Sequence, residues 1–377
     1  MPYSEVLIIG GGASGLTTAG ALKHYGVETV ILDKDECTGD VWRDRYSRLR
    51  LHTIRGLSYL AYHKMSEDLP RYVPKDQFAD YLQNYAIQLQ LDIRHGCTVT
   101  AIEQIDDGEW CVQTEQGDEW RAKHIIIATG LNRTPQMPTF EGADHYKGNL
   151  FHSIAYKTGM DFVDKRVLVI GSGNTGTEIC ADLVENGAKD VHISIRTPPL
   201  IVPRDPFGIP IHVWGVPMSF LPAGLGDRIA SIMARIQLGN LARYGLEKAQ
   251  WAIFKDKRIP TIDVGFVKYL KRGDITIQPD VSAFTPDGVK FKDGTLASYD
   301  VVIAATGYRS GLQNVIQLPD VIDDDGNLLL TCGEPTPYDG LWFVGLVNSP
   351  AGILMAARIQ SRKVAKYIAV EMGRIIQ

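Results

Sequence analysis

The chain has few cysteines and no grouping of metal-binding side chains. Its five cysteines are Cys37, Cys97, Cys111, Cys180 and Cys332; they form no Cys-x-x-Cys pair. This scattered, odd set argues against a disulfide framework and against a redox-active dithiol. The nine histidines form no His-x-x-x-His or mixed Cys/His cluster, so we expect no protein-held metal.

Long apolar runs and a strong excess of one charge are also missing. No apolar run approaches the roughly 20 residues that a membrane-spanning helix needs. The first residues lack the basic and apolar regions of a secretory signal. A net charge of -5 gives no general attraction to nucleic acid. We therefore predict a cytoplasmic protein with no nucleic-acid partner and no transmembrane segment.

Two glycine-rich turns each lie between an apolar run and a helical pattern. Gly10-Gly11-Gly12-Ala13-Ser14-Gly15 follows the run 6–9, and Gly171-Ser172-Gly173-Asn174-Thr175-Gly176 follows the run 166–170. Parallel strands need crossover helices, so each turn predicts a βαβ unit. Because 377 residues exceed what one core usually organises, the sequence predicts an α/β fold with two Rossmann-like dinucleotide-binding domains.

The first turn has the features of a nucleotide site. Gly10 allows the tight turn, Gly12 lets a pyrophosphate approach the backbone, and Gly15 lets helix and strand pack closely. The N–H groups at the start of the helix then bind phosphate. Asp33, at the end of the next strand, is placed to accept hydrogen bonds from a ribose 2'-OH. We assign FAD to this turn.

The second turn differs at the end of its following strand. Arg196 and Thr197 stand where the first unit has its carboxylate. A carboxylate there would repel a 2'-phosphate, whereas Arg196 can bind one with two hydrogen bonds. We therefore assign NADPH, rather than NADH, to this turn.

The segment before the second turn carries a family pattern. Tyr146, Gly148, His152 and Tyr156 match Phe-x-Gly-x-x-x-His-x-x-x-(Phe/Tyr), with Tyr in place of the first Phe, and 305–308 reads Ala-Thr-Gly-Tyr. With the paired turns, these motifs resemble the class B flavin-dependent monooxygenases, in the branch of the flavin-containing monooxygenases. The similarity extends over most of the chain and is closest to plant YUCCA-type indole-3-pyruvate monooxygenases, in segments 51–52, 72–78, 238–246, 260–265, 273–275 and 305–310.

Two positions depart from common forms of the family. His52 stands where many heteroatom-oxidising relatives carry an Asn near the flavin; YUCCA-type sequences have His there. A catalytic role for His52 and a purely structural role both remain open. The family's Gly-Gly-x-Trp reads Gly39-Asp40-Val41-Trp42 here, so Asp40 places an anion near the expected flavin region.

The resemblance and the turns together give two sets of expected cofactor residues. The FAD set is Gly10, Gly12, Ala13, Ser14, Gly15, Asp33, Lys34, Trp42, Gly130 and Gly345. The NADPH set is Gly171, Ser172, Gly173, Asn174, Thr175, Gly176, Arg196, Thr197, Ala305, Thr306 and Gly307.

The expected domains follow from the same argument. Residues 1–152 and 305–377 would bind FAD, and residues 153–304 would bind NADPH, with a mostly helical insertion at about 198–262. The NADPH domain would thus be inserted in the FAD domain, and a homodimer is a candidate assembly.

The resemblance implies an oxygenase that acts on a small organic molecule with O2. NADPH would reduce FAD, and a flavin C4a-(hydro)peroxide would oxidatively decarboxylate an aromatic 2-oxo acid such as indole-3-pyruvate. Arg204 and Arg309 are candidate anchors for its carboxylate. N- or S-oxygenation of a small amine or sulfide is the main alternative. An NADPH-dependent reductase without oxygen transfer and a non-enzymatic NADPH sensor are alternatives of other classes.

Overall fold

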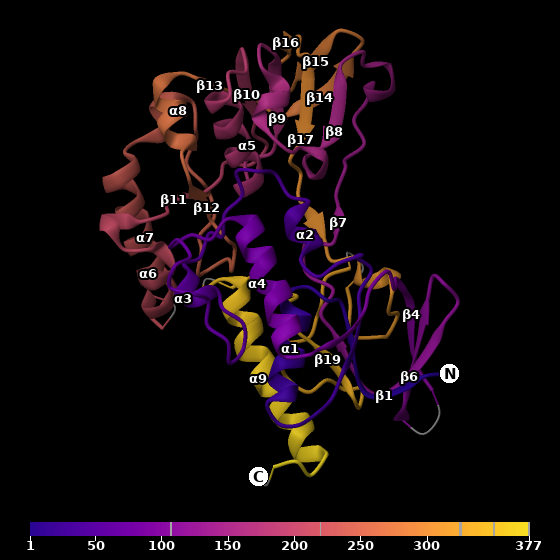
Figure 1. Ribbon diagram of the computed structural model, residues 1–377. Helices are drawn as coiled ribbons and strands as arrows, with labels where there is room; N and C mark the ends of the chain where they lie inside the picture. Colours follow the sequence, from indigo (N-terminus) through magenta and orange to yellow (C-terminus); the bar gives the residue numbers. More distant parts are fainter. Residues whose placement is uncertain (106–107, 219, 324–325, 350, 376–377) are drawn as a thin grey trace. The chain divides into compact units, whose positions relative to one another are not determined.

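The chain divides into two compact units. The computed structural model describes residues 1–105, 108–218, 220–323, 326–349 and 351–375 (Figure 1). The first unit comprises Met1–Asp44, Thr53–Thr134 and Tyr308–Gln377; the second comprises Arg45–His52 and Pro135–Gly307. Two short strands, β7 (Thr134–Pro135) and β18 (Tyr308–Arg309), lie where the chain passes between units.

The first unit is built on one mixed sheet of order β3-β2-β1-β6-β5-β4, with β19 also paired to β6. Strands β3, β2, β1, β6 and β19 run parallel, whereas β5 and β4 are antiparallel additions. Their bounds are β1 (Tyr3–Ile9), β2 (Val30–Leu32), β3 (Asp92–Arg94), β4 (Val99–Gln104), β5 (Trp110–Thr114), β6 (Glu119–Ile127) and β19 (Leu341–Phe343).

Helices cover this sheet, and the continuous apolar runs of its central strands follow from burial on both faces. Leu7, Ile125 and Phe343 are fully buried in one core. The helices are α1 (Ala13–Lys23), α2 (Asp40–Arg43), α3 (Arg55–Ser58), α4 (Lys75–Gln88), η7 (Leu312–Asn314) and α9 (Ile353–Glu371). Figure 1 shows α9 alongside α1, and these two helices are in contact.

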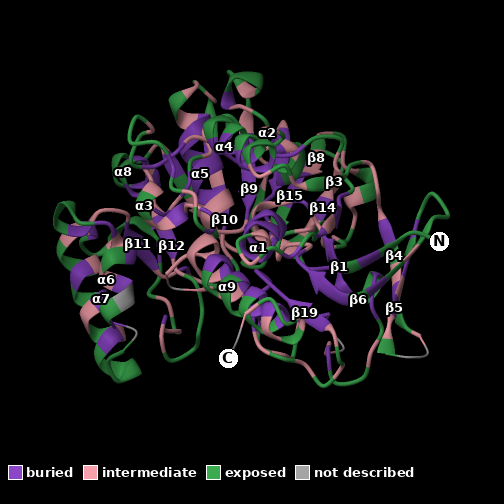
Figure 2. Ribbon diagram, turned by 60° about the horizontal axis from the view of Figure 1, so that its bottom comes forward, coloured by how far each residue is buried: buried purple, intermediate pink, exposed green. Residues whose placement is uncertain are grey.

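The second unit is built on a wholly parallel sheet of order β13-β10-β9-β17-β8. Figure 2 shows buried residues along β9 and β10. The strands are β8 (Asn149–His152), β9 (Arg166–Ile170), β10 (Asp190–Ser194), β13 (Ile275–Gln278) and β17 (Val301–Ala304). The helices beside this sheet are α5 (Asn174–Glu185), α8 (Phe266–Arg272), η2 (Ala143–His145), η3 (Ser153–Ala155) and η4 (Gly159–Phe162).

A small antiparallel sheet completes this unit with β14 (Val281–Thr285), β15 (Gly288–Phe291) and β16 (Leu296–Ala297). The expected insertion at about 198–262 begins and ends in a parallel strand pair, β11 (Ile201–Pro203) with β12 (Thr261–Asp263). Between these strands lie η5 (Pro206–Gly208), α6 (Ile211–Met218), α7 (Ala223–Leu238) and η6 (Leu241–Tyr244). Val202, Ala230, Ile253 and Ile262 form a separate core there.

The predicted fold class is confirmed. In each of the two doubly wound sheets, a central strand is followed by a glycine turn and then by a helix. The unit limits do not coincide with the expected domain limits. Residues 149–152 form an edge strand of the second sheet, because β8 pairs with β17, although the expected first domain ran to residue 152. In the described part of the chain, no helix has the length and apolar character needed to cross a bilayer.

Replacing Gly15 with alanine should destabilise the first unit. The added Cβ would lie well under 3.0 Å from the carbonyl oxygen of Gly10, a backbone atom that cannot rotate away. We expect the free energy of unfolding in urea to fall by about 3 kcal/mol.

Gly12→Ala is the matched control, because a Cβ there meets nothing within 4 Å. With both proteins free of bound nucleotide, this variant should unfold within about 0.5 kcal/mol of the parent protein. A Gly15→Ala protein as stable as Gly12→Ala would show that the helix does not approach the strand as described.

Candidate functional site

The two glycine turns have the same backbone geometry. Gly10 and Gly171 have φ values of +106° and +109°, which favour glycine. At Gly15 and Gly176 an added Cβ would collide with the carbonyl oxygens of Gly10 and Gly171. Each helix therefore approaches its preceding strand through the third glycine of the motif, as a dinucleotide turn requires.

The middle glycine of each turn faces open space. A Cβ on Gly12 or Gly173 would meet no atom within 4 Å. Both residues precede helices, α1 and α5, whose first turns carry no capping side-chain hydrogen bond in the described residues. Backbone N–H groups beside free space, at the positive end of a helix, suit a phosphate. Both turns therefore fit the pyrophosphate of a dinucleotide.

Asp33 lies beside the first turn. Its carboxylate accepts a hydrogen bond from the Gly11 backbone, and a Cβ on Gly11 would stand 2.5 Å from Oδ2. Burial raises the pKa of Asp33, Asp35 raises it further, and the Gly11 hydrogen bond opposes both. Lys34 is exposed, and its ammonium pairs with Asp35 at 2.9 Å. The geometry thus brings Asp33 to the turn, whereas Lys34 has a partner of its own.

Two further segments of the first unit reach this turn. A Cβ on Gly345 would collide with the hydroxyl of Ser14, and the Cα of Thr129 lies 3.1 Å from a Cβ placed on Gly10. Gly130 follows with φ +85° and open space around it. Ala13 is the first residue of α1.

Sequence reasoning missed two polar groups here. Thr129 Oγ1 and Arg133 Nη1 are buried and have no hydrogen-bond partner among the described residues. Burial lowers the pKa of Arg133. Orphaned polar atoms after β6 are consistent with a bound ligand supplying the missing partners. The repeated Ala-Thr-Gly could have indicated Thr129, but nothing in the sequence pointed to Arg133.

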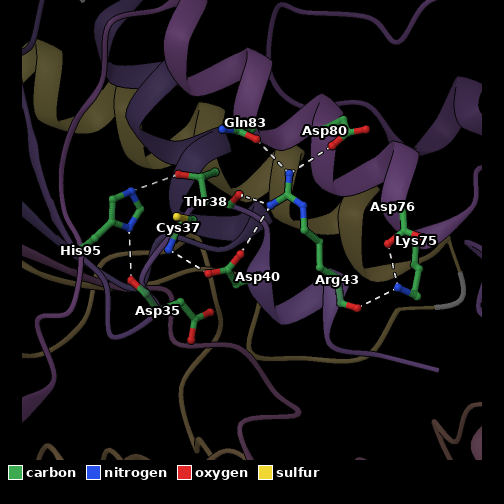
Figure 3. Close-up of polar contacts among 10 residues, drawn as sticks. All are labelled: Asp35, Cys37, Thr38, Asp40, Arg43, Lys75, Asp76, Asp80, Gln83 and His95. Carbon is green, nitrogen blue, oxygen red and sulfur yellow. Dashed lines mark hydrogen bonds and ion pairs between the residues drawn. The ribbon is translucent and has the colours of Figure 1, made fainter. Parts of the chain in front are cut away.

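In the segment around Trp42, the negative charge of Asp40 is balanced by the guanidinium of Arg43. Trp42 packs edge-on against Phe78 at 4.7 Å between ring centroids. Figure 3 shows Asp40 between two partners: Oδ2 accepts the Cys37 N–H at 2.9 Å, and Oδ1 lies 3.5 Å from Arg43. Asp40, the first residue of α2, is therefore an ion-paired carboxylate rather than an isolated anion.

Arg43 fixes this segment to α4. Its guanidinium donates to the carbonyl oxygen of Thr38, to Asp80 and to Gln83, at 2.8, 3.1 and 2.9 Å (Figure 3). Lys75 donates to the carbonyl oxygen of Arg43 at 2.7 Å. These bonds determine where Trp42 is held.

The second turn is tied to the insertion. Asn174 Oδ1 accepts the Ile262 N–H at 2.7 Å, and the Ser172 carbonyl oxygen accepts the Thr261 hydroxyl at 3.0 Å. The acceptor atoms of these two expected NADPH residues thus bind β12. Thr175, half-buried, lies in the first turn of α5.

The positively charged residue expected at the second site, Arg196, is exposed to solvent. Arg196 and Thr197 follow β10 and are exposed. Within the described residues, Arg196 forms no ion pair or hydrogen bond. A guanidinium of this kind fits a phosphate on the ribose of the nucleotide.

Residues 305–307 lie against the same turn. A Cβ on Gly171 would collide with the carbonyl oxygen of Ala305. Thr306 donates its hydroxyl hydrogen to the Gln136 carbonyl oxygen at 2.5 Å, and the Gly307 carbonyl oxygen accepts from His152 Nε2 at 3.1 Å. The structure therefore brings together Gly171–Gly176 with Ala305 and Thr306.

The family pattern before the second turn holds the second unit together. Tyr146 donates to the Tyr299 carbonyl oxygen at 2.8 Å, and Tyr156 donates to Asp182 at 2.6 Å. A Cβ on Gly148 would collide with the ring of Tyr146. With the His152 contact, all four pattern residues make packing or hydrogen-bonding contacts inside this unit.

His52 has a buried carboxylate partner that the sequence did not reveal. Its Nε2 lies 2.5 Å from Oε1 of Glu178, whose side chain is only 3% exposed. Burial alone would lower the pKa of His52, but the charge of Glu178 and the hydrogen bond to it outweigh burial, so the pKa is raised. Arg204 acts in the opposite sense.

A second histidine lies in the same electrostatic environment. His212, on α6, is buried, and its Nδ1 has no partner among the described residues. Burial, and then the charge of His52, lower the pKa of His212 to about 4. The pKa values of the two imidazoles are thus shifted in opposite directions.

No group of three or more His, Cys, Asp or Glu side chains in the described residues has the arrangement of a metal site.

Two doubly wound units, each with a dinucleotide turn, define a protein with two dinucleotide-binding domains. The chain belongs to the flavin-binding monooxygenase-like family, which matches residues 4–369. It is therefore an oxidoreductase and a flavin monooxygenase.

Within this family, the chain is similar to proteins named indole-3-pyruvate monooxygenases. The chain is 34% identical over 346 residues to indole-3-pyruvate monooxygenase YUCCA1 of Oryza sativa subsp. japonica, covering 89% of this chain and 83% of that protein. It is 32% identical over 377 residues to probable indole-3-pyruvate monooxygenase YUCCA1 of Arabidopsis thaliana, covering 97% and 89%.

Solved structures confirm the fold. A flavin-containing monooxygenase from Stenotrophomonas maltophilia matches with a TM-score of 0.74 at 22% identity, covering 99% of this chain and 100% of that chain. An open crystal structure of cyclohexanone monooxygenase matches with a TM-score of 0.78 at 20% identity, covering 99% and 88%.

Because His212 is buried and has a lowered pKa, we expect the folded protein to lose stability in acid. In the unfolded chain the His212 imidazole would bind a proton near pH 6.5. In the folded protein it stays neutral until the pH falls to its pKa of about 4. Stability from this residue is present above pH 6.5 and is lost as pH falls through that interval, by about 3 kcal/mol.

His212→Gln removes this titration and keeps the other histidines. Urea unfolding between pH 7 and pH 4 should show a shallower loss of stability for this variant. Parallel pH profiles for the two proteins would contradict a buried, neutral His212.

Proposed function

We propose that this chain is an FAD- and NADPH-dependent monooxygenase that oxidatively decarboxylates an aromatic 2-oxo acid such as indole-3-pyruvate. The observation that carries the proposal is the likeness, over 89–97% of the chain, to proteins named indole-3-pyruvate monooxygenases. Two turns that fit dinucleotides support it.

The residues of the first turn would hold FAD. The N–H groups at the start of α1 would bind its pyrophosphate beside Gly12, and Asp33 would accept hydrogen bonds from its ribose. Trp42 and Gly345 belong to the same proposed set. When bound, the flavin accepts a hydride from NADPH and, once reduced, activates O2 for transfer of one oxygen atom.

The residues of the second turn would hold NADPH. The start of α5 would bind its pyrophosphate beside Gly173, and Arg196 would bind its 2'-phosphate. Asn174 would act indirectly, since its side-chain oxygen fixes the turn to β12.

The reaction balances with one molecule of each reactant. A 2-oxo acid, O2, NADPH and a proton give the acid one carbon shorter, CO2, water and NADP+. His52 is the proposed catalytic residue of the chain. A cytoplasmic location and a homodimer stay predictions.

Product analysis tests the reaction. The purified holoenzyme should consume NADPH and release CO2 in nearly equal amounts with indole-3-pyruvate, and ¹⁸O₂ should place one labelled atom in the acid product. Absence of CO2 release from every 2-oxo acid would overturn the proposal. An added oxygen on an amine or sulfide would then assign the heteroatom chemistry, and hydrogen peroxide alone would indicate a reductase or oxidase.

Arg196→Gln should weaken the choice of NADPH over NADH. Loss of a charge-assisted bond worth about 1.5–3 kcal/mol should raise the KM for NADPH roughly 10- to 100-fold while the KM for NADH changes little. Stopped-flow flavin reduction with each nucleotide measures both.

Arg228→Gln, at an exposed arginine of α7, is the control and should keep the parental preference. An unchanged preference for NADPH in the Arg196 variant would show that Arg196 does not bind the nucleotide.

A further inference from the structure

A cavity lies beside the family pattern of the second unit. Its volume is about 400 Å³, and its walls come from the segment 137–140, from η2 and from β8, the edge strand of the parallel sheet. All of these walls belong to the second unit. None of the described residues that line the cavity belongs to the sets expected to bind FAD or NADPH. The cavity is therefore a separate place for a ligand, and its volume suits a small organic molecule.

The apolar walls of the cavity are held by one aromatic cluster. The rings of Phe140 and Tyr146 each lie 5.2 Å from the ring of Phe284, measured between centroids. The Tyr146 hydroxyl also donates to the Tyr299 carbonyl oxygen at 2.8 Å, and Leu150 packs against the same core. Phe140, Tyr146 and Leu150 are thus fixed from the core side, and they remain half-buried where they line the cavity.

Gly148 allows the Tyr146 ring to lie where it does. A Cβ on this glycine would collide with the hydroxyl and with ring carbons of Tyr146, so the backbone at 148 lies directly against that side chain. A larger residue at 148 would have to displace the ring from Phe284. The first two fixed positions of the family pattern, 146 and 148, therefore shape one wall of this cavity.

A single carboxylate gives the cavity its charge. Of the described residues that line it, Asp144 alone is charged, and within the described part of the chain its carboxylate forms no ion pair or hydrogen bond. Lys147, the nearest lysine or arginine along the chain, pairs with Asp287 at 3.0 Å. Tyr146 stays uncharged, because burial raises the pKa of its hydroxyl to about 12. The cavity thus combines one unpaired negative charge with aromatic and aliphatic walls.

This combination fits an organic cation. A cation is attracted by a carboxylate and by the electron-rich faces of aromatic rings, and the alkyl groups of an organic ion would cover half-buried apolar surface. An anion would be repelled by Asp144 and would meet no positively charged side chain among the described residues of the lining.

We propose that this cavity binds a small quaternary ammonium ion, with Asp144 as its counter-ion and with Phe140 and Tyr146 as its aromatic walls. A quaternary centre donates no hydrogen bond, so it does without the three acceptors that a primary ammonium group requires. The site goes beyond the proposed function, because no step of that reaction uses its residues. Binding there does not depend on whether the chain decarboxylates a 2-oxo acid.

Calorimetric titration of the holoenzyme with choline, without NADPH, tests the site. The matched probe is 3,3-dimethylbutan-1-ol, which has nearly the same shape as choline but no charge. Choline should bind with a Kd below about 1 mM, and the alcohol should bind at least about fivefold more weakly. Raising NaCl from about 0.05 M to about 0.5 M should weaken the binding of choline alone. No binding of choline, or equal affinity for the two probes, would overturn the proposal.

Asp144→Asn removes the charge from an exposed position and should leave the fold intact. Choline affinity should fall about fivefold, while affinity for the alcohol stays the same. Glu141→Gln is the matched control, because Glu141 is an exposed neighbouring carboxylate that is not part of the lining. It should change choline affinity less than about twofold. Equal losses in the two variants would show that the general negative charge of the segment, rather than Asp144, attracts the cation.

Two further variants test the aromatic walls. Phe140→Leu keeps an apolar side chain but removes the ring, so choline should lose about three- to fivefold more affinity than the alcohol does. Tyr146→Phe keeps the ring and should bind choline within about twofold of the parent protein. Urea unfolding midpoints verify that each variant is folded. An undiminished preference for choline over the alcohol in Phe140→Leu would contradict the aromatic role of Phe140.

Discussion

The structure depends on the close approach of a helix to the strand before it, which occurs once in each unit. At Gly15 and Gly176 the helix backbone reaches the first carbonyl of the turn, leaving no room for a side chain. This contact sets the start of α1 and of α5, so it also aims their free N–H groups at the open space beside Gly12 and Gly173. The phosphate sites that we propose would thus follow from a packing constraint.

The sequence predicted the parts of the fold that depend on local pattern. The apolar runs gave both sets of central strands, because a strand buried on two faces must be apolar throughout, and the glycine spacing gave both turns. The edge of the second sheet escaped prediction: Asn149–His152 pairs with β17, and Leu150 lies beside Val302, which is 152 positions further along the chain. Such pairing is decided by packing rather than by local sequence.

The candidate site was predictable only where a motif names the residue. Asp33 and Arg196 follow from their place after a strand, but Glu178, His212 and Arg133 do not, since nothing in a single sequence shows which buried polar groups face one another. Asp40 shows the converse. Its charge suggested an effect on the flavin region, and the structure gives it Arg43 and the Cys37 N–H as partners.

Two hydrogen bonds join the second turn to β12, so the turn and this end of the insertion are expected to move together. Asn174 and Ser172 are held by neighbouring residues of a strand whose chain leads directly out of the insertion. A shift of the backbone at the turn must therefore displace β12, and with it β11, its parallel partner. Hydrogen exchange at the Ile262 amide thus measures the rigidity of the nucleotide turn itself.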